Sequence, residues 1–184
     1  SDHGEEFFER GAMGHRGNHS LYQELLHVPL VIRLPGGRGA GLQIEDPVSL
    51  VDVMPTILDL LGLDAPGGMA GRSLVPLIDG KQGPGARPLY AELTDADDQV
   101  TRCLIEHPWK YIHHFTLGTG LLYRLDDDPG ETRDLSGVET ARAARMRDDL
   151  LEWTGKTVPV LEPAMPAILS PEDVERLEAL GYLQ

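Results

Sequence analysis

The sequence has a single cysteine, Cys103, in 184 residues, and this scarcity excludes two kinds of architecture. One thiol cannot form an internal disulfide, so the fold is not held together by a disulfide framework. A zinc site built from several cysteines is excluded for the same reason. The cysteine count leaves the cellular compartment open, because secreted proteins can also lack disulfides.

Long apolar runs and an excess of basic residues are also missing. No run approaches the roughly 18 apolar residues that a membrane-spanning helix needs. The formal net charge is −14, which argues against a nucleic-acid or anionic-membrane partner, because both require a basic surface. The first residues, SDHGEE, contain no secretory signal and no initiator methionine, so we expect the chain to begin within a longer protein.

What the sequence does contain is ordinary for a globular protein. Hydrophobic residues make up 41% and charged residues 25% of the chain, so there is enough apolar material for a core. A chain of this length predicts either one domain or part of a larger core together with a small subdomain.

The first half of the sequence predicts the edge of an α/β domain. Residues 1–20 are polar and punctuated by glycine, which indicates a loop. The apolar run at residues 28–34, closed by Pro-Gly, predicts a buried strand. Apolar residues then recur at helical spacing over residues 49–61, with a serine as the cap and Gly62 as the end of the helix.

The second half predicts a small antiparallel sheet followed by helices. Three short strands are predicted at residues 88–93, 100–106 and 109–115, and the last two can pair as a hairpin. A fourth strand in LLYRLDDDPGE ends at a Pro-Gly turn. An amphipathic helix is predicted over residues 138–153, and an extended linker and a last helix follow it.

Asp2 and His3 are the sharpest chemical signal that the residues themselves offer. An aspartate and a histidine side by side at the end of a strand can both turn toward a cation at the carboxyl edge of a sheet, where open α/β sheets bind ligands. A carboxylate and an imidazole suit Mn, Fe or Zn at least as well as Ca, which prefers oxygen. Taken alone the dipeptide is a weak signal.

Other polar residues are interpreted as structural. His113 and His114 alternate along a strand and point to opposite faces, so they cannot share one metal. The acidic run 126–128 precedes Pro-Gly, and its side chains are expected to bond the backbone of a turn. Asp52 and Asp59 are interpreted as solvated positions on a helix.

Several phrases of the sequence occur in an order that is typical of one enzyme family. They are SDHGEEF, GHRGNHSLYQELLHVPLVIRLPG, DPVSLVDVMPTILDLLGL, GRSLVPLIDG, KYI, LLYRLDDDPGETRDL and LEALGYL. This succession resembles the C-terminal portion of the sulfatase family, which is part of the alkaline-phosphatase-like hydrolases. The resemblance covers essentially the whole chain.

The resemblance implies an α/β fold with a division into three parts. Residues 1–85 are expected to be the C-terminal part of an alkaline-phosphatase-like α/β sandwich. Residues 86–158 are expected to form a small antiparallel β-sheet subdomain with a packed helix. Residues 159–184 are expected to be a linker and a terminal helix.

The resemblance also implies roles for three residues. In the family, an Asp followed by Asn or His in this S-D-x-G segment supplies two ligands of a divalent cation, which are Asp2 and His3 here. Relatives place a Lys or His that contacts the sulfate shortly before the Tyr-Gln phrase, and His19 matches it best, although the register of lysine-bearing relatives falls on Asn18. Such a side chain would stabilise charge on the leaving oxygen. The alternative for His19 is a loop histidine satisfied by the backbone.

The sequence departs from a complete sulfatase because it lacks the nucleophile. Sulfatases use a formylglycine made from a Cys or Ser in a C/S-x-P-x-R motif. Cys103 stands in RCLIEH, which has neither the proline nor the arginine, and no serine begins such a motif. We therefore expect the formylglycine and the other metal ligands in a preceding N-terminal part, and we interpret Cys103 as a small strand residue.

Three functional hypotheses result. The first is hydrolysis of a small-molecule or carbohydrate sulfate ester with a divalent cation, for which Ca²⁺ is favoured and Mn²⁺, Mg²⁺ and Zn²⁺ are alternatives. The second is a phosphodiesterase or phosphonate monoester hydrolase of the same superfamily. The third is that the isolated chain is a non-catalytic fragment whose unpaired sheet edge can form a homo-oligomer. The natural substrate stays open in all three.

Overall fold

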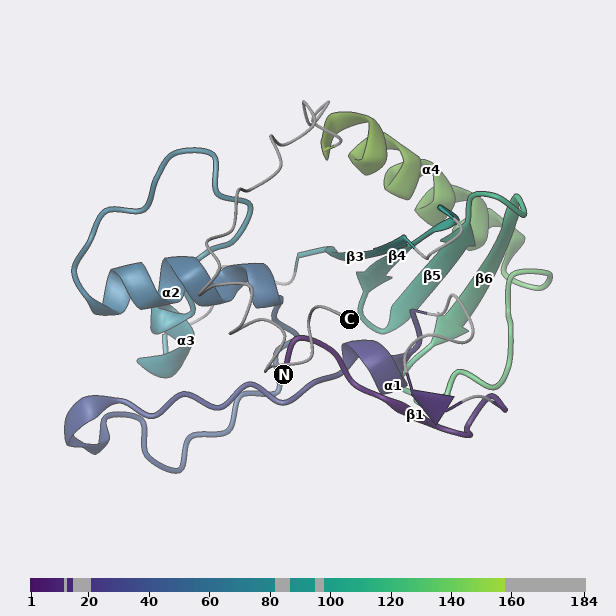
Figure 1. Ribbon diagram of the computed structural model, residues 1–184. Coiled ribbons are helices and arrows are strands. Elements are labelled where there is room, and N and C mark those ends of the chain that lie inside the picture. The colour runs from purple at the N-terminus through teal and green to yellow at the C-terminus, as the bar shows by residue number, and fades with distance from the viewer. Residues whose placement is uncertain (12, 15–20, 82–86, 95–97, 158–184) are drawn as a thin grey trace, which may run out of the picture. The chain divides into compact units, whose positions relative to one another are not determined.

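The computed structural model describes residues 1–11, 13–14, 21–81, 87–94 and 98–157 (Figure 1). The chain divides into two compact units, residues 1–151 and 152–184. The elements below belong to the first unit, apart from the end of the last helix. Over the ranges given above, none of the helices is long and apolar enough to cross a membrane.

A four-stranded antiparallel sheet is the largest element of the structure. Its strands are β3 (Leu89–Thr94), β4 (Val100–Glu106), β5 (Trp109–His114) and β6 (Thr119–Arg124). They lie in the order β3-β4-β5-β6, so each strand pairs with its neighbour in sequence (Figure 1). This confirms the four predicted strands and the predicted hairpin between residues 100–106 and 109–115.

One face of the sheet packs against the N-terminal part of the chain. Alternation along the strands places Cys103, Ile112 and Tyr123 on this face, and their side chains are buried. Leu21 joins them in one hydrophobic cluster, and Leu26 packs against it. The segment around α1 (Gln23–Leu26) therefore covers this face of the sheet.

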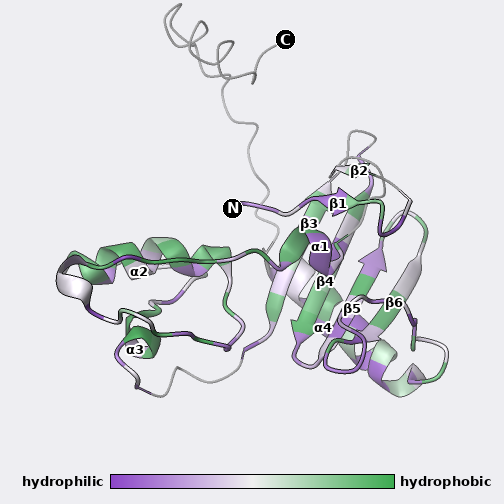
Figure 2. Ribbon diagram, turned by 90° about the horizontal axis from the view of Figure 1, so that it is seen from below, coloured by the Kyte–Doolittle hydropathy of each residue, from purple (hydrophilic) through white to green (hydrophobic). Residues whose placement is uncertain are grey.

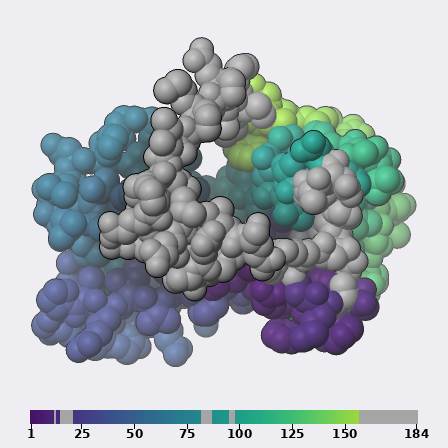
Figure 3. Space-filling model, in the orientation of Figure 1, coloured from purple at the N-terminus to yellow at the C-terminus, as the bar shows by residue number. Residues whose placement is uncertain are grey.

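The other face is covered by α4 (Thr140–Thr157), as Figure 1 shows. Met146 and Leu150 of this helix are buried, which confirms the apolar stripe of the predicted helix. The guanidinium of Arg142 lies 4.3 Å from the centre of the Trp109 ring. In the space-filling view the sheet and α4 form one continuous surface (Figure 3).

The outer edge of β6 is occupied by the chain that follows it. The backbone N–H of Leu122 donates to the Asp134 carboxylate at 3.0 Å, and the N–H of Leu135 donates to the Leu122 carbonyl at 2.8 Å. Asp134 also accepts from the backbone and the hydroxyl of Ser136, both at 2.8 Å. These bonds satisfy polar groups that an edge strand would otherwise expose to another chain.

The N-terminal segment contains short elements only. β1 (Glu6–Phe7) and β2 (Met13–Gly14) pair antiparallel. Beyond α1 lie three further short helices, η1 (Pro35–Gly37), η2 (Leu50–Asp52) and α3 (Val75–Ile78). α2 (Val53–Leu60) continues directly from η2, so the two together correspond to the helix predicted from the apolar spacing of residues 49–61.

Asp52 is buried, so its interpretation as a solvated helix position was wrong. Its carboxylate accepts from the backbone N–H of Ser49 at 3.0 Å and of Arg72 at 2.9 Å, and it pairs with the Arg87 guanidinium. A helix-cap residue can bond the backbone of a distant segment in this way, which the spacing along one helix does not reveal. Asp59, by contrast, is exposed as predicted.

The predicted buried strand at residues 28–34 is also wrong. The segment forms no strand, no described strand pairs with it, and the side chain of Val31 is 89% exposed. A strand needs partners for its backbone groups, and the four strands of the sheet pair with one another instead. The apolar run therefore lies on the surface of this chain.

η2 and α2 also present an apolar stripe to solvent. Leu50 of η2, Met54 and Ile57 of α2 and Leu61 directly after it recur at helical spacing, and all four side chains are exposed. Figure 2 shows hydrophobic colouring along much of this helix. Leu30, Val31 and Ile32 of the run at residues 28–34 are exposed as well.

Cys103 is predicted to be unreactive in the folded chain. Its side chain is fully buried, and burial raises the pKa of the thiol to about 11, with the charge of Lys110 opposing this in part. Because the thiolate is the reactive form, we expect Ellman's reagent to label the native chain at least about 100-fold more slowly than the chain unfolded in guanidinium. Stoichiometric labelling of the native chain at the unfolded rate would contradict the prediction.

Asp134 is predicted to make stability depend on acid pH. Burial opposes the charge of its carboxylate, but the hydrogen bonds from Leu122 and Ser136 outweigh this and lower the pKa of Asp134 below its ordinary value of 3.8. A lowered folded pKa stabilises the fold above the unfolded value, and the contribution is lost as the pH falls through the folded value. Asp134→Ala should cost about 1 kcal/mol at pH 7, after allowance for its solvent exposure.

Urea unfolding followed by tryptophan fluorescence would measure this. The difference between wild type and Asp134→Ala should persist down to about pH 4 and shrink below the ordinary pKa of 3.8. Asp46→Ala, at an exposed aspartate, is the matched control and should change stability little at any pH. A stability difference that stays constant down to about pH 2, or one that grows on acidification, would refute the assignment.

Candidate metal site

Asp2 and His3 lie side by side near the start of the chain, as the metal hypothesis requires. A carboxylate oxygen of Asp2 lies 3.8 Å from Nε2 of His3. The two side chains are 90% and 43% exposed, so an ion can reach both. A backbone hydrogen bond at Asp2 lowers the pKa of the Asp2 carboxyl, which favours the anionic form that can bind a cation.

The ring of His3 is oriented by the backbone. Its Nδ1 lies 2.8 Å from the carbonyl oxygen of Gly4. A carbonyl oxygen can only accept, so Nδ1 carries the proton and the neutral ring has its lone pair on Nε2. Metal-binding histidines commonly have this second contact, which fixes the tautomer and the direction of the donor nitrogen.

The spacing of the two donors fits a divalent cation. Bonds from such ions to carboxylate oxygen or imidazole nitrogen are about 2.0–2.6 Å long, so one ion can contact both donors. About four to eight donors complete the shell of such an ion. The described part of the chain holds no group of three or more His, Cys, Asp or Glu side chains that could bind a metal. Asp2 and His3 can therefore supply only part of a site.

The remaining predicted chemical residues are placed as follows. His19 lies outside the described residues, so its role stays a prediction. His113 and His114 occupy alternate positions of β5, as the exclusion of a shared metal requires, and Nδ1 of His114 lies 3.0 Å from the Thr101 hydroxyl. Cys103 is a buried residue of β4, as interpreted from the sequence.

Gly4 holds the Asp2–His3 pair against α1. Its backbone N–H donates to the carbonyl of Leu25 at 2.9 Å. A Cβ at this position would lie 1.9 Å from the carbonyl oxygen of Glu24, so only glycine allows the two backbones to approach this closely. The position of Asp2 and His3 therefore depends on the position of α1.

α1 is in turn held by a buried ion pair between Lys110 of β5 and Glu131, which follows β6. The Lys110 Nζ and a Glu131 carboxylate oxygen are 2.6 Å apart, and both side chains are fully buried. The other Glu131 oxygen accepts from the backbone N–H of Gln23 at 2.6 Å, and Lys110 donates to the Gln23 side chain at 3.3 Å. One buried carboxylate thus connects the sheet to the first residue of α1.

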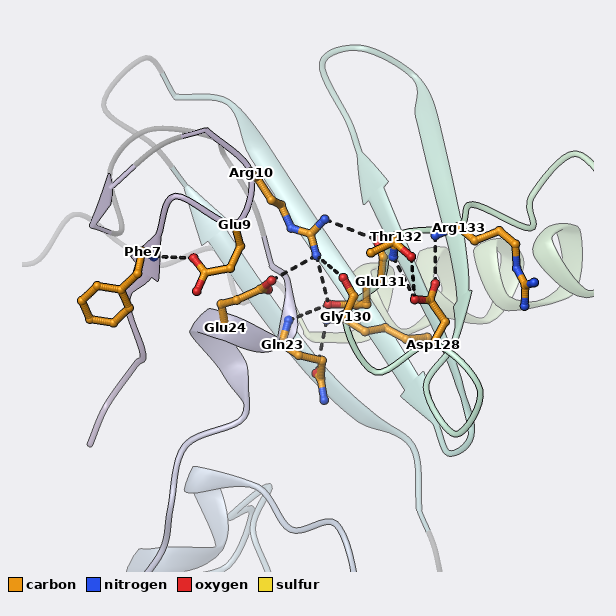
Figure 4. A network of polar contacts seen from close by, with 11 residues as sticks. Phe7, Glu9, Arg10, Gln23, Glu24, Asp128, Gly130, Glu131, Thr132 and Arg133 are labelled. Atoms are coloured by element: carbon orange, nitrogen blue, oxygen red, sulfur yellow. Dashed lines mark hydrogen bonds and ion pairs between the residues drawn. The ribbon is translucent and has the colours of Figure 1, made fainter.

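Arg10 adds a second connection between the same segments (Figure 4). Its guanidinium donates to the Gly130 carbonyl at 2.8 Å and the Glu131 carbonyl at 3.2 Å. It also pairs with the Glu24 carboxylate at 3.2 Å and lies 3.4 Å from the centre of the Tyr22 ring. The planar guanidinium can serve all these partners at once, which a lysine could not.

The turn that carries Glu131 is held by Asp128 in the way predicted for the acidic run, whereas Asp126 and Asp127 pair with the Arg124 guanidinium instead. Asp128 accepts from the backbone N–H groups of Thr132 and Arg133 at 3.1 and 2.8 Å. These bonds outweigh the opposing effect of desolvation and lower the pKa of the Asp128 carboxyl. The turn therefore presents the Glu131 side chain toward Lys110 from a fixed backbone.

Sequence reasoning gave no role to Lys110, Glu131 or Gln23, although all three lie within the quoted phrases. A signal for Lys110 was present, because alternation along its strand places it on the same face as Ile112, which is an apolar position. A lysine on an apolar face requires a buried partner of opposite charge. The identity of that partner depends on a contact 21 positions away in sequence, which periodicity cannot supply.

A protein-family model matches most of the chain. The family model described as N-sulphoglucosamine sulphohydrolase, C-terminal, matches residues 11–154. Among curated relatives, arylsulfatase K of Danio rerio is 34% identical over 148 residues, which are 74% of this chain and 27% of that protein. The multifunctional alkaline phosphatase superfamily protein PehA of Trinickia caryophylli is 35% identical over 165 residues, which are 80% of this chain and 31% of that protein.

Solved structures of a sulfatase and of a phosphonate monoester hydrolase are similar to this chain. The phosphonate monoester hydrolase of Silicibacter pomeroyi is similar with a TM-score of 0.71 and 25% identity, over 85% of this chain and 34% of that one. A sulfatase of Bacteroides thetaiotaomicron is similar with a TM-score of 0.65 and 25% identity, over 76% and 32% of the two chains. The chain spans about a third of the length of the proteins it matches.

Proposed function

The chain belongs to the sulfatase family, as a C-terminal portion, and from this premise we propose that the protein hydrolyses sulfate esters of small molecules or carbohydrates. The observation that carries the proposal is the Asp2–His3 pair. We assign the pair to two metal-ligand positions of the family, from the resemblance of the S-D-x-G segment. In support, a carboxylate oxygen of Asp2 lies 3.8 Å from Nε2 of His3, and the His3 ring is oriented by the Gly4 carbonyl. The family is one of sulfuric ester hydrolases, and the activity of the whole protein is what we propose.

In this proposal the residues of the chain would bind the cation and orient the sulfate ester. A divalent cation, with Ca²⁺ favoured and Mn²⁺, Mg²⁺ or Zn²⁺ as alternatives, would supply the positive charge that polarises the sulfate oxygens. Asp2 would bind it through its anionic carboxylate, and His3 through Nε2. His19 would hold or protonate the leaving oxygen. A formylglycine nucleophile and the other ligands would come from polypeptide outside this chain.

Two observations support a larger catalytic unit than this chain. The proteins that it matches are about three times as long. The apolar run at residues 28–34 and the stripe on α2 are exposed, as surfaces that pack against further polypeptide would be. We propose that the isolated chain is inactive, and the divisions at residues 85 and 158 and a homo-oligomer stay predictions.

A phosphonate monoester or phosphodiester substrate is the second candidate. Two phosphonate monoester hydrolases, from Silicibacter pomeroyi and Agrobacterium radiobacter, match the fold with TM-scores of 0.71 and 0.68. An imidazole ligand at His3 also suits a transition metal as well as it suits calcium. The sulfate ester is preferred because the matching family model is that of a sulphohydrolase and because arylsulfatase K of Danio rerio and of Homo sapiens are among the curated relatives.

Turnover of an aryl sulfate and of a phenylphosphonate monoester by the protein, produced as its gene encodes it, tests the proposal. We expect the sulfate ester to be hydrolysed with the higher kcat/KM. Asp2→Asn should lower kcat/KM at least about 100-fold, because the neutral amide is a poorer ligand for the cation. The bound metal, measured by elemental analysis after dialysis, should fall in parallel.

Asp46→Asn is the matched control, since it removes an exposed carboxylate elsewhere in the same segment of chain and should leave turnover and metal content unchanged. Rapid hydrolysis of the phosphonate without turnover of the sulfate would reject the proposal in favour of the second candidate. Unchanged metal content and activity in Asp2→Asn would reject the metal site itself.

A further inference from the structure

The Lys110–Glu131 ion pair raises the question of what it contributes. Removing two charges from water is unfavourable, and well-packed apolar residues of the same size would often stabilise a fold equally well. Both side chains are nevertheless fully buried, at the centre of the contacts between the sheet and α1. A buried pair of this kind is best attested where it fixes one arrangement of neighbouring segments rather than where it adds stability.

The segment that the pair fixes is α1. A helix of four residues cannot be stable by itself, because helices shorter than about 12 residues are marginal in water. The position of α1 must therefore come from its contacts with the sheet. Glu131 bonds the N–H of the first residue, Gln23, and Lys110 bonds the side chain of the same residue.

α1 then determines where Asp2 and His3 lie. Gly4 follows them directly, donates to Leu25, and has no room for a Cβ against the Glu24 carbonyl. The Gly4 carbonyl also accepts from the His3 ring at 2.8 Å. A shift of α1 would therefore carry Gly4 with it and change both the spacing and the orientation of the two donors.

We propose that Lys110 and Glu131 are positioning residues for the Asp2–His3 metal pair and act on it through Gln23, α1 and Gly4. This inference rests on the proposed function, because it needs a metal at Asp2 and His3. It assigns to the small C-terminal sheet a part in building the metal site. Residues that hold metal ligands in place without contacting the metal typically change its affinity by about 10- to 100-fold.

The test is a metal titration of the protein as its gene encodes it. Metal-stripped wild type and the double variant Lys110→Met/Glu131→Leu are titrated with Ca²⁺ and separately with Mn²⁺ in a calorimeter. The double variant leaves neither partner as an unpaired buried charge, but it removes the acceptor of the Gln23 N–H, so its thermal midpoint should fall by no more than that of the Leu150→Ala control described below. Its affinity for the metal should fall by about 10- to 100-fold.

Leu150→Ala is the matched control. It removes buried contacts between α4 and the opposite face of the sheet, so it should lower the thermal midpoint and leave metal affinity unchanged. Gly4→Ala should lower metal affinity like the double variant, because it displaces the same backbone contact while Lys110 and Glu131 stay in place. The combination separates positioning from general loosening of the fold.

Two results would overturn the inference. One is wild-type affinity in the folded double variant, and the other is an equal loss of affinity in Leu150→Ala. Asp2→Asn distinguishes failure of the inference from failure of the proposed function. If Asp2→Asn loses the metal while the double variant keeps it, only the inference fails; if Asp2→Asn keeps the metal, both fail.

Discussion

The contact between Lys110 and Glu131 holds together three segments that are distant in sequence: β5, the turn after β6, and α1. Breaking such a buried pair by removing one partner typically costs about 3–5 kcal/mol, because the remaining charge stays in an apolar environment. Of the three segments, β5 is held by its neighbouring strands and the turn by its own hydrogen bonds, whereas α1 depends on this contact for its place. α1 has four residues, and the turn is held by hydrogen bonds to Asp128.

The two faces of the sheet pack against different segments. On one face α4 packs through Met146 and Leu150, and removal of such contacts would change stability without reaching Asp2 and His3. On the other face Cys103, Ile112 and Tyr123 pack against the segment that contains α1. Asp2 and His3 connect to the C-terminal sheet on this second face, because Gly4 lies against α1.

The sequence predicted the elements that are governed by local periodicity. The strands at residues 100–106 and 109–115 and the stripe with Met146 and Leu150 follow from alternation and helical spacing, and the structure confirms them. Contacts between distant segments were beyond such reasoning. Asp52 is buried because Arg72 and Arg87, which are distant in sequence, bond its carboxylate. Val31 is exposed because none of the described strands pairs with its segment. The metal site at Asp2 and His3 stays a prediction, and it could be made from sequence because the two residues are adjacent.

Glu131 has a backbone conformation that would suit glycine, yet the contacts of its carboxylate require a glutamate. Its φ is 49°, in the left-handed region that glycine adopts without strain and that costs other residues on the order of 1 kcal/mol or more. Glycine here would remove that strain, but Lys110 would then remain charged and buried without its partner, and the Gln23 N–H would lose its acceptor. The loss of both contacts exceeds the strain that glycine would relieve. The contacts to Lys110 and α1 therefore account for a glutamate at a left-handed backbone position, where the turn alone would favour glycine.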